Sequence, residues 1–374
     1  MRYWQVKGLN RINRDTDIDC AKGILIVLVL IGHLGADVKG DNVILNLVTF
    51  LIYTFHMPAF VFISGYLSKN LEKSRESGFR SILMYFLFQV SWSVFSVAVL
   101  HDYTPALRMY EPGPALWYIL ALGVWRFFQK EILSIRCCFL ISVVLAILSV
   151  CTAEVLPMMA IPRIIGFMPF FLLGYYTSTP IIKEKIQGSN IFISVLGAIV
   201  LILFSWVCIK NQITLSITAH NYGYKTINNN IYMALVLNLV IYIINFIGVF
   251  VFVRLSYCLK NCKYFVRVGG NTLYIYVLSN YFQKVWYVIL HKYNLLLAND
   301  YLNYGVSLIV SAAVIFICCS DIVVKVFDYI VDKYLSYRYS NSSYDLIIDY
   351  IERINCFCFC NKVNGYESFN CRRK

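Results

Sequence analysis

Long apolar segments divide this chain of 374 residues and constrain what it can fold into. About 20 residues of α-helix cross the hydrocarbon core of a bilayer. With 59% hydrophobic and 14% charged residues, the composition also departs from that of soluble domains. The sequence therefore predicts an all-α, polytopic membrane bundle of about ten transmembrane helices. The expected spans are 20–38, 43–67, 79–100, 114–128, 136–153, 161–179, 191–209, 231–253, 271–290 and 303–328.

The first and fourth of these segments are short in strictly apolar residues, so half-buried segments are the alternative there. The expected domains are a cytoplasmic N-terminal segment over 1–19, a transmembrane domain over 20–330 and a cytoplasmic tail over 331–374. No internal sequence repeat is visible, so the pattern of an inverted-repeat transporter gains no support.

Positive charge is concentrated on one side of the expected topology. Lysine and arginine are enriched in cytoplasmic loops of membrane proteins, and the net charge of +13 follows this asymmetry rather than indicating a nucleic-acid partner. Both termini are therefore expected in the cytoplasm. The richer, inner set is Arg2, Lys7, Arg11, Arg14, Lys69, Lys73, Arg75, Arg80, Arg126, Lys130, Arg136, Lys183, Lys185, Arg254, Lys260, Lys263 and Arg267. The outer set is Lys39, Arg108, Arg163, Lys210, Lys225 and Lys292.

Two histidines lie inside apolar segments. His33 lies near the end of the stretch "CAKGILIVLVLIGHLGA", and His56 lies near the start of "FHMPAFVFISGYLSKN". A rise of 1.5 Å per residue places His33 ~16 Å above Lys22 and His56 ~20 Å above Lys69. Both imidazoles are thus expected at a similar depth, where they could face one cavity. Polar groups in lipid are costly without a partner, so the pair indicates a functional site; the alternative is that each histidine is packed and bonded to a neighbouring helix.

The surroundings of the two histidines carry further signals. Asp19 and Lys22 are three residues apart and lie below His33 on one helix face. Pro58 frees the carbonyl of Thr54 and kinks its helix, which requires another donor for that carbonyl. Gly65 would allow close approach of another chain segment.

Thirteen cysteines are present, and the tail contains "CFCFCNKVNGYESFNC". The C-x-C-x-C spacing is a poor match to metal-binding patterns, so no metal site is expected. Cys151 and Cys208 fall near outer ends, where they could pair or remain free.

The stretch "RDTDIDCAKGILIVLVLIGH" resembles the opening signature of the membrane acyltransferase-3 family, particularly its fucose-4-O-acetylase-like branch. "FHMPAFVFISGYL" resembles the next block of that family, and the resemblance covers residues 14 to about 330. Ser279 replaces a usual histidine, and Met84-Tyr85 stands where a proline is usual. The matching residues of the first block are Arg14, Asp19, Lys22, Gly23, Gly32 and His33. Weaker resemblances are "PALWYILALGVWR", "IPRIIGFMPFFLLGYY" and "VGGNTLYIYVLSNYF".

The resemblance implies transfer of an acyl group, usually acetyl, from acyl-CoA to a sugar hydroxyl of a surface glycan or its lipid-linked precursor, in a bacterial inner membrane. Acetyl-CoA would be a co-substrate, with no tightly bound cofactor. The expected catalytic residues are His33, as base or transient acyl carrier, with His56 and Asp19. The expected contacts are Arg14, Lys22 and Arg80 with the coenzyme A phosphates, and Ser64 and Trp117 with the substrate.

Two other functions remain as alternatives: a flippase for a glycan or lipid, and a polysaccharide polymerase. A flippase is expected to carry charges deep in several spans, and here the deep ones are chiefly Lys284 and Lys325. A polymerase is expected to carry a large basic external loop, and loop 210–230 has only Lys210 and Lys225. His220 in that loop is expected to be solvated.

Overall fold

The computed structural model describes residues 15–151, 158–220, 230–293 and 295–339. Within these ranges all regular structure is helical. Asp15 caps the first helix by accepting from the amides of Asp17 and Ile18, and Asn42 caps the second in the same way. The longer helices are α1 (Thr16–Ala36), α2 (Val43–Tyr66), α3 (Leu71–Leu100), α5 (Leu116–Phe127), α7 (Cys138–Leu148), α8 (Ile161–Tyr176), α9 (Ile191–Lys210), α10 (Ile231–Ser256), α12 (Thr272–Lys292), α13 (Asp300–Cys318) and α14 (Asp321–Tyr339). The shorter ones include α4 (Thr104–Leu107), α6 (Gln129–Ser134), the π-helix Ile181–Gln187 and α11 (Lys263–Gly270).

Six helices in the described ranges are long and apolar enough to cross a membrane, namely α1, α2, α3, α9, α10 and α13. A seventh span results if α8 and the π-helix, bent by 108°, count as one. The polytopic all-α bundle is therefore confirmed, while the count of ten and the placement of the termini stay predictions. Large apolar side chains point outward, as lipid requires: Phe192 and Leu196 on α9 are 75% and 63% exposed.

Several expected spans differ from the observed helices. The expected span 303–328 is wrong as a single helix, because α13 ends at Cys318 and α14 begins at Asp321, with Ser320 accepting from the amide of Val323. The expected segments 114–128 and 136–153 hold helices of only 12 and 11 residues. The first segment, by contrast, is a complete helix of 21 residues.

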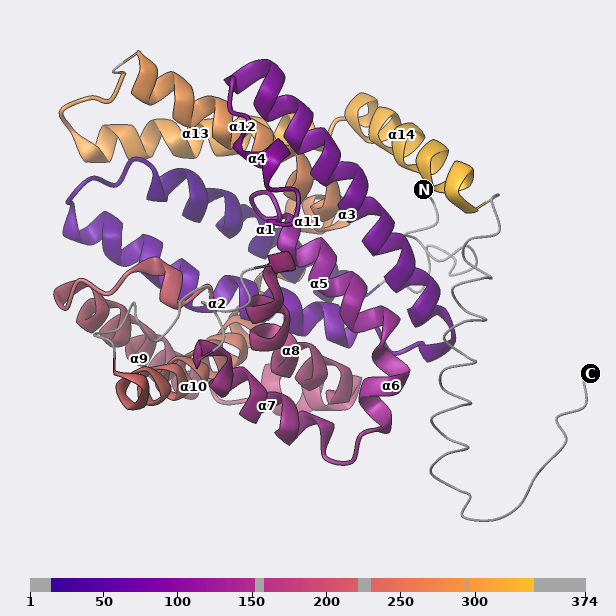
Figure 1. Ribbon diagram of the computed structural model, residues 1–374. Coiled ribbons are helices and arrows are strands. Elements are labelled where there is room, and N and C mark those ends of the chain that lie inside the picture. Colours follow the sequence, from indigo (N-terminus) through magenta and orange to yellow (C-terminus); the bar gives the residue numbers. More distant parts are fainter. Residues whose placement is uncertain (1–14, 152–157, 221–229, 294, 340–374) are drawn as a thin grey trace, which may run out of the picture. The chain divides into compact units, whose positions relative to one another are not determined.

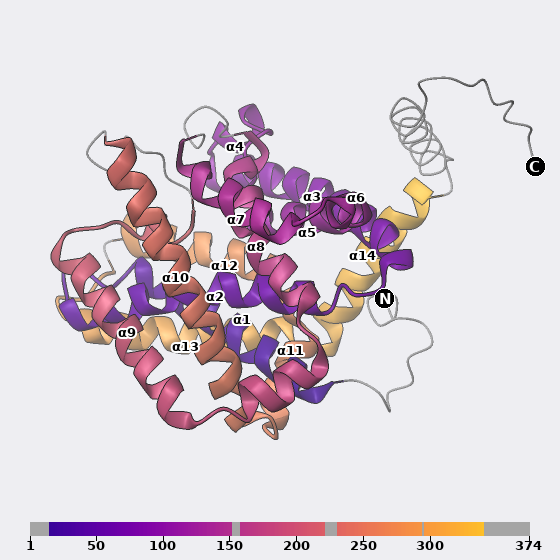
Figure 2. The same cartoon turned by 90° about the horizontal axis from the view of Figure 1, so that it is seen from below.

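Helix α1 lies in the interior and contacts α2, α11, α12 and α13 (Figures 1 and 2). A tight turn at Gly40, with φ +52°, reverses the chain between α1 and α2. The two helices are therefore antiparallel neighbours, and the last turns of α1 lie beside the first half of α2. This arrangement places His33 and His56 on adjacent helices.

Close contacts at glycines fix the neighbours of α1 and α2. A β-carbon at Gly23 would overlap the carbonyl of Phe265 in α11, and one at Gly65 would overlap the carbonyl of Phe171 in α8. Small residues at helix interfaces allow such close backbone approach in membranes. The expectation for Gly65 is confirmed, and α8 is thereby held against α2.

The chain divides into two compact units, Met1–Phe327 and Asp328–Lys374. The features described below all belong to the first unit. The expected tail over 331–374 begins within α14, and its cysteines lie outside the described residues.

Gly65→Ala is expected to lower the stability of the fold by about 1–3 kcal/mol, because the added methyl overlaps the Phe171 carbonyl. Gly305→Ala in α13 is the matched control, since a β-carbon there meets open space. Thermal unfolding of the two purified variants in detergent measures the difference. Equal unfolding temperatures would contradict the close α2–α8 contact.

Candidate functional site

The two membrane histidines lie next to each other. His33 is in the last turn of α1 and His56 is in the middle of α2. Their ring centroids are 6.3 Å apart and the rings are nearly perpendicular, at 89°. The structure therefore brings the two imidazoles together, in agreement with the similar depth expected for them.

Tyr53 joins the two histidines, although its role was not expected from the sequence. Its hydroxyl is 3.0 Å from Nδ1 of His33, and its ring centroid is 5.0 Å from that of His56. Tyr53 precedes His56 by three residues, so both side chains lie on one face of α2. His56 is only 2% exposed, whereas His33 retains partial exposure. Of the two imidazoles, His33 is therefore the more exposed.

Hydrogen bonds define which imidazole nitrogens are available. Nδ1 of His56 is 2.8 Å from the carbonyl of Ile52, which can only accept, so His56 carries its proton there and has a lone pair on Nε2. When Nδ1–H of His33 donates to the Tyr53 oxygen, Nε2 of His33 is likewise a free base. Within the described ranges, no hydrogen bond occupies Nε2 of His33.

Arg163 is a charged residue of this site that the sequence reasoning missed. It lies in the first turn of α8, with its guanidinium 5.2 Å from the ring centroid of Trp117. Its charge acts on His33, Tyr53 and Tyr276. Its Nε is buried and, among the described residues, unpaired. An arginine within an apolar segment was the available signal, but Arg163 was assigned to an outer loop.

Ser64 and Trp117, both expected to contact substrate, lie in an aromatic cluster formed by α2, α5, α8 and α12. The Ser64 hydroxyl donates to the carbonyl of Phe60 (3.0 Å) and is hydrogen-bonded to the hydroxyl of Tyr118. Trp117 stacks on Phe167 with centroids 5.1 Å apart. Ser64 is thus engaged with its own helix and with a tyrosine, and Trp117 is the member of the cluster that contacts Arg163.

The basic residues expected at the inner face are separate from the histidines. Lys22 is paired with Asp19 at 2.9 Å, as their spacing predicts, and Arg80 is paired with Glu76 at 2.6 Å. The two pairs lie on different helices, α1 and α3. Arg14 lies outside the described residues. Asp19 is ~21 Å along α1 from His33, so its carboxylate cannot contact that imidazole.

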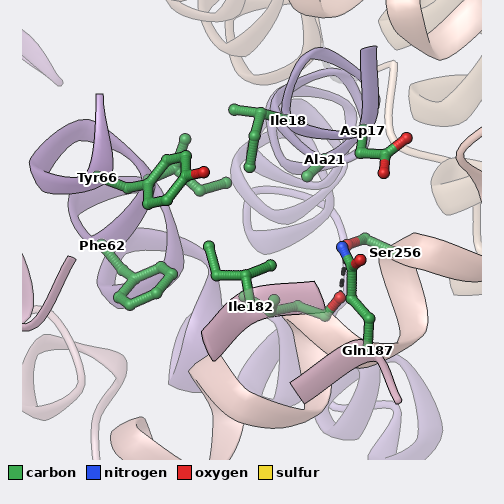
Figure 3. Close-up of a pocket in the computed structure, with 10 residues that line it drawn as sticks. Asp17, Ile18, Ala21, Phe62, Tyr66, Ile182, Gln187 and Ser256 are labelled. Atoms are coloured by element: carbon green, nitrogen blue, oxygen red, sulfur yellow. Dashed lines mark hydrogen bonds between the residues drawn. The ribbon is translucent and has the colours of Figure 1, made fainter. Parts of the chain in front are cut away.

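A small pocket lies where the first turn of α1 meets the ends of α2 and α10 and the π-helix (Figure 3). Asp17 and Ala21 of α1, Tyr66 of α2, Gln187 of the π-helix and Ser256 of α10 line it. None of the expected site residues is among its lining residues. It is therefore distinct from the histidine site, which lies near the opposite end of α1.

The expectation that His220 is solvated is wrong. Its side chain is 3% exposed and stacks on Tyr242 at a centroid distance of 4.6 Å, with the edge of Phe167 4.9 Å away. The segment that follows η5 (Leu215–Ile217) turns inward and buries the imidazole between α8 and α10. An aromatic surface in these two helices explains the burial.

The thiols show no pairing in the described residues. Cys151 and Cys208 are both free in the structure. In the part of the chain that the structure describes, no three His, Cys, Asp or Glu side chains are grouped to hold a metal ion.

Comparison with known proteins gives one family and two partial relatives. Residues 15–324 match the family model described as an acyltransferase domain. The nodulation protein NolL of Sinorhizobium fredii is 51% identical over 61 residues, 16% of this chain and 17% of that protein. NolL of Mesorhizobium japonicum is 47% identical over 75 residues, 18% of this chain and 19% of that protein. The match therefore spans less than a fifth of either relative, and no solved structure matches the chain.

The hydrogen bond between Ser64 and Tyr118 predicts energetic coupling between α2 and α5. Ser64→Ala and Tyr118→Phe are each expected to lower the free energy of unfolding. The double variant should lose less free energy of unfolding than the sum of the two single losses. The difference should be about 0.5–1.5 kcal/mol, the net value of one such hydrogen bond. Chemical unfolding of the four proteins measures the coupling. Strictly additive losses would show that the two hydroxyls do not interact.

Proposed function

Because the chain belongs to the acyltransferase family, we propose that it is an integral membrane O-acyltransferase that uses acetyl-CoA to acetylate a sugar hydroxyl. The acceptor is a surface polysaccharide or its lipid-linked precursor in a bacterial inner membrane. The multi-pass membrane architecture supports the proposal. So does the resemblance of residues 14–33 and 55–67 to the fucose-4-O-acetylase-like branch.

The observation that carries the proposal is the His33–Tyr53 pair beside His56. A sugar hydroxyl is a weak nucleophile and needs a base when it attacks a thioester. Tyr53 orients His33, and Nε2 of His33 takes the hydroxyl proton. The sugar oxygen then bonds to the acetyl carbon, the carbon–sulfur bond breaks, and the proton passes from the imidazole to the departing coenzyme A sulfur.

Arg163 supplies the electrostatic part of this mechanism. Negative charge develops on the thioester oxygen during attack, and a preorganised cation in a water-poor site stabilises such charge. The Nε–H of the Arg163 guanidinium is buried and unpaired among the described residues, so it can donate to that oxygen. Trp117 holds the guanidinium from its ring face.

The donor approaches from the cytoplasmic side, where Arg14, Lys22 and Arg80 would bind its phosphates. In that case Lys22 and Arg80 exchange their carboxylate partners for phosphate oxygens. The ~16 Å rise along α1 from Lys22 to His33 separates the phosphate contacts from the base. The pantetheine arm therefore extends along the bundle to His33. There Nε2 acts as the base, or it accepts the acetyl group from the thioester, releases coenzyme A and passes the group to the sugar oxygen.

His33→Ala is expected to reduce acetyl transfer at least about 100-fold, because it removes the base while leaving the helix intact. Transfer of labelled acetyl from acetyl-CoA to the isolated surface glycan measures the effect. His291→Ala is the matched control, since His291 is exposed at the end of α12 and bonds only to the carbonyl of Tyr287 among the described residues. Retained transfer by His33→Ala would remove the assignment of the base.

Arg80→Ala is expected to raise KM for acetyl-CoA about tenfold with little change in kcat, because it removes a contact with the donor phosphates. Steady-state kinetics at saturating acceptor separate the two parameters. Arg108→Ala is the control: Arg108 belongs to the outer set and pairs with Glu111 at 3.5 Å. Equal KM values for these two variants would place the phosphate contact elsewhere.

A further inference from the structure

Pro58, inside α2, leaves a backbone carbonyl without its helical donor, and an asparagine of α10 binds that carbonyl. Pro58 has no N–H, so the carbonyl of Thr54 lacks its helical donor. The amide nitrogen of Asn245 lies 2.7 Å from that carbonyl and 3.3 Å from the carbonyl of Ile241. The reverse amide orientation would set an oxygen against two carbonyl oxygens, so the nitrogen must face them.

His220 holds the other end of this amide. Nε2–H of His220 donates to the Asn245 oxygen at 3.0 Å. The imidazole is fixed in turn by its stacking on Tyr242. Asn245 is fully buried, with 0% exposure. A buried amide with all its bonds in place has one orientation, which makes it a rigid strut between α10 and α2.

Close packing explains why Asn245 reaches α2. Gly248 lies three residues further along α10, and a β-carbon there would overlap the β-carbon of Phe55 at 2.6 Å. Phe55 itself stacks on Phe252 with centroids 5.9 Å apart. The two backbones therefore approach each other at the turn of α2 that contains the freed carbonyl.

In the sequence, Thr54 lies between Tyr53 and His56, the two residues of α2 whose side chains contact His33. Tyr53 immediately precedes Thr54, and His56 follows it by two residues. We propose that Asn245 is a positioning residue: by binding the Thr54 carbonyl it fixes the turn of α2 that places Tyr53 and His56 against His33. The expected loss of kcat rests on the proposed acetyl transfer at His33. The expected loss of stability rests on the hydrogen bond alone.

Asn245→Leu is expected to lower kcat about 10- to 100-fold with less than about a threefold change in KM for acetyl-CoA. The leucine fills the space but leaves the carbonyl unpaired, and a misplaced Tyr53–His56 turn slows the chemical step rather than donor binding. A purely structural role would instead lower the amount of folded enzyme and leave kcat per folded molecule unchanged.

Asn238→Leu is the matched control. Asn238 is also buried, lies two turns earlier on α10, and donates to the carbonyls of Ala146 and Ile147 rather than to α2. It is expected to lose stability and to keep kcat within about twofold of the parent enzyme. Similar kcat losses in both variants would overturn the proposal, because any buried asparagine of α10 would then have the same effect.

A second measurement needs no activity. Pro58→Ala restores an N–H that can bond to the Thr54 carbonyl, so Asn245 is less needed there. Asn245→Leu should therefore lower the unfolding temperature of the parent about twice as much as that of the Pro58→Ala variant. Equal decreases would show that Asn245 does not serve the freed carbonyl and would overturn the proposal. The parent enzyme could also show no acetyl transfer while the unfolding temperatures differ as expected. That result would reject the proposed function but support the hydrogen bond from Asn245 to the Thr54 carbonyl.

Discussion

The hydrogen bond between the Tyr53 hydroxyl and His33 joins the two helices on which the site depends. It connects the last turn of α1 to the first half of α2 at 3.0 Å. A polar side chain in hydrocarbon must find its partner inside the protein. The pairing therefore fixes the relative position of α1 and α2 and, through it, the distance between His33 and His56.

The same requirement organises the surrounding helices. Ser64 of α2 is bonded to Tyr118 of α5, and Asn245 of α10 is bonded to the Thr54 carbonyl of α2. Each bond connects α2 to a different neighbour, while Gly65 allows α8 to approach closely from another side. Helix α2 is thus held by α1, α5, α8 and α10, which suits a helix that carries Tyr53 and His56.

Much of the site could be predicted because helix geometry converts sequence spacing into depth. Counting residues from Lys22 and Lys69 predicted a similar depth for His33 and His56. That the two rings are neighbours follows from the packing of α1 against α2. The position of Arg163 could not be found by counting residues, because α8 meets α2 and α5 only through tertiary packing. The burial of His220 could not be predicted either, because it also depends on tertiary packing. The available signal was the pair Asn238 and Asn245, which lie seven residues apart on one face of an apolar helix and indicate a polar partner. The break after Cys318 had a local signal, because Ser320 and Asp321 are residues that commonly begin a helix. The predicted span 303–328 followed the length of the apolar segment instead.

The most direct test of acetyl transfer is mass spectrometry of the surface glycan from the organism that carries this chain, with and without its gene. The glycan from cells without the gene is expected to be lighter by one acetyl group per modified sugar, with its amount and chain length unchanged. A glycan of unchanged repeat mass that is shorter or less abundant would contradict the account and favour a flippase or a polymerase.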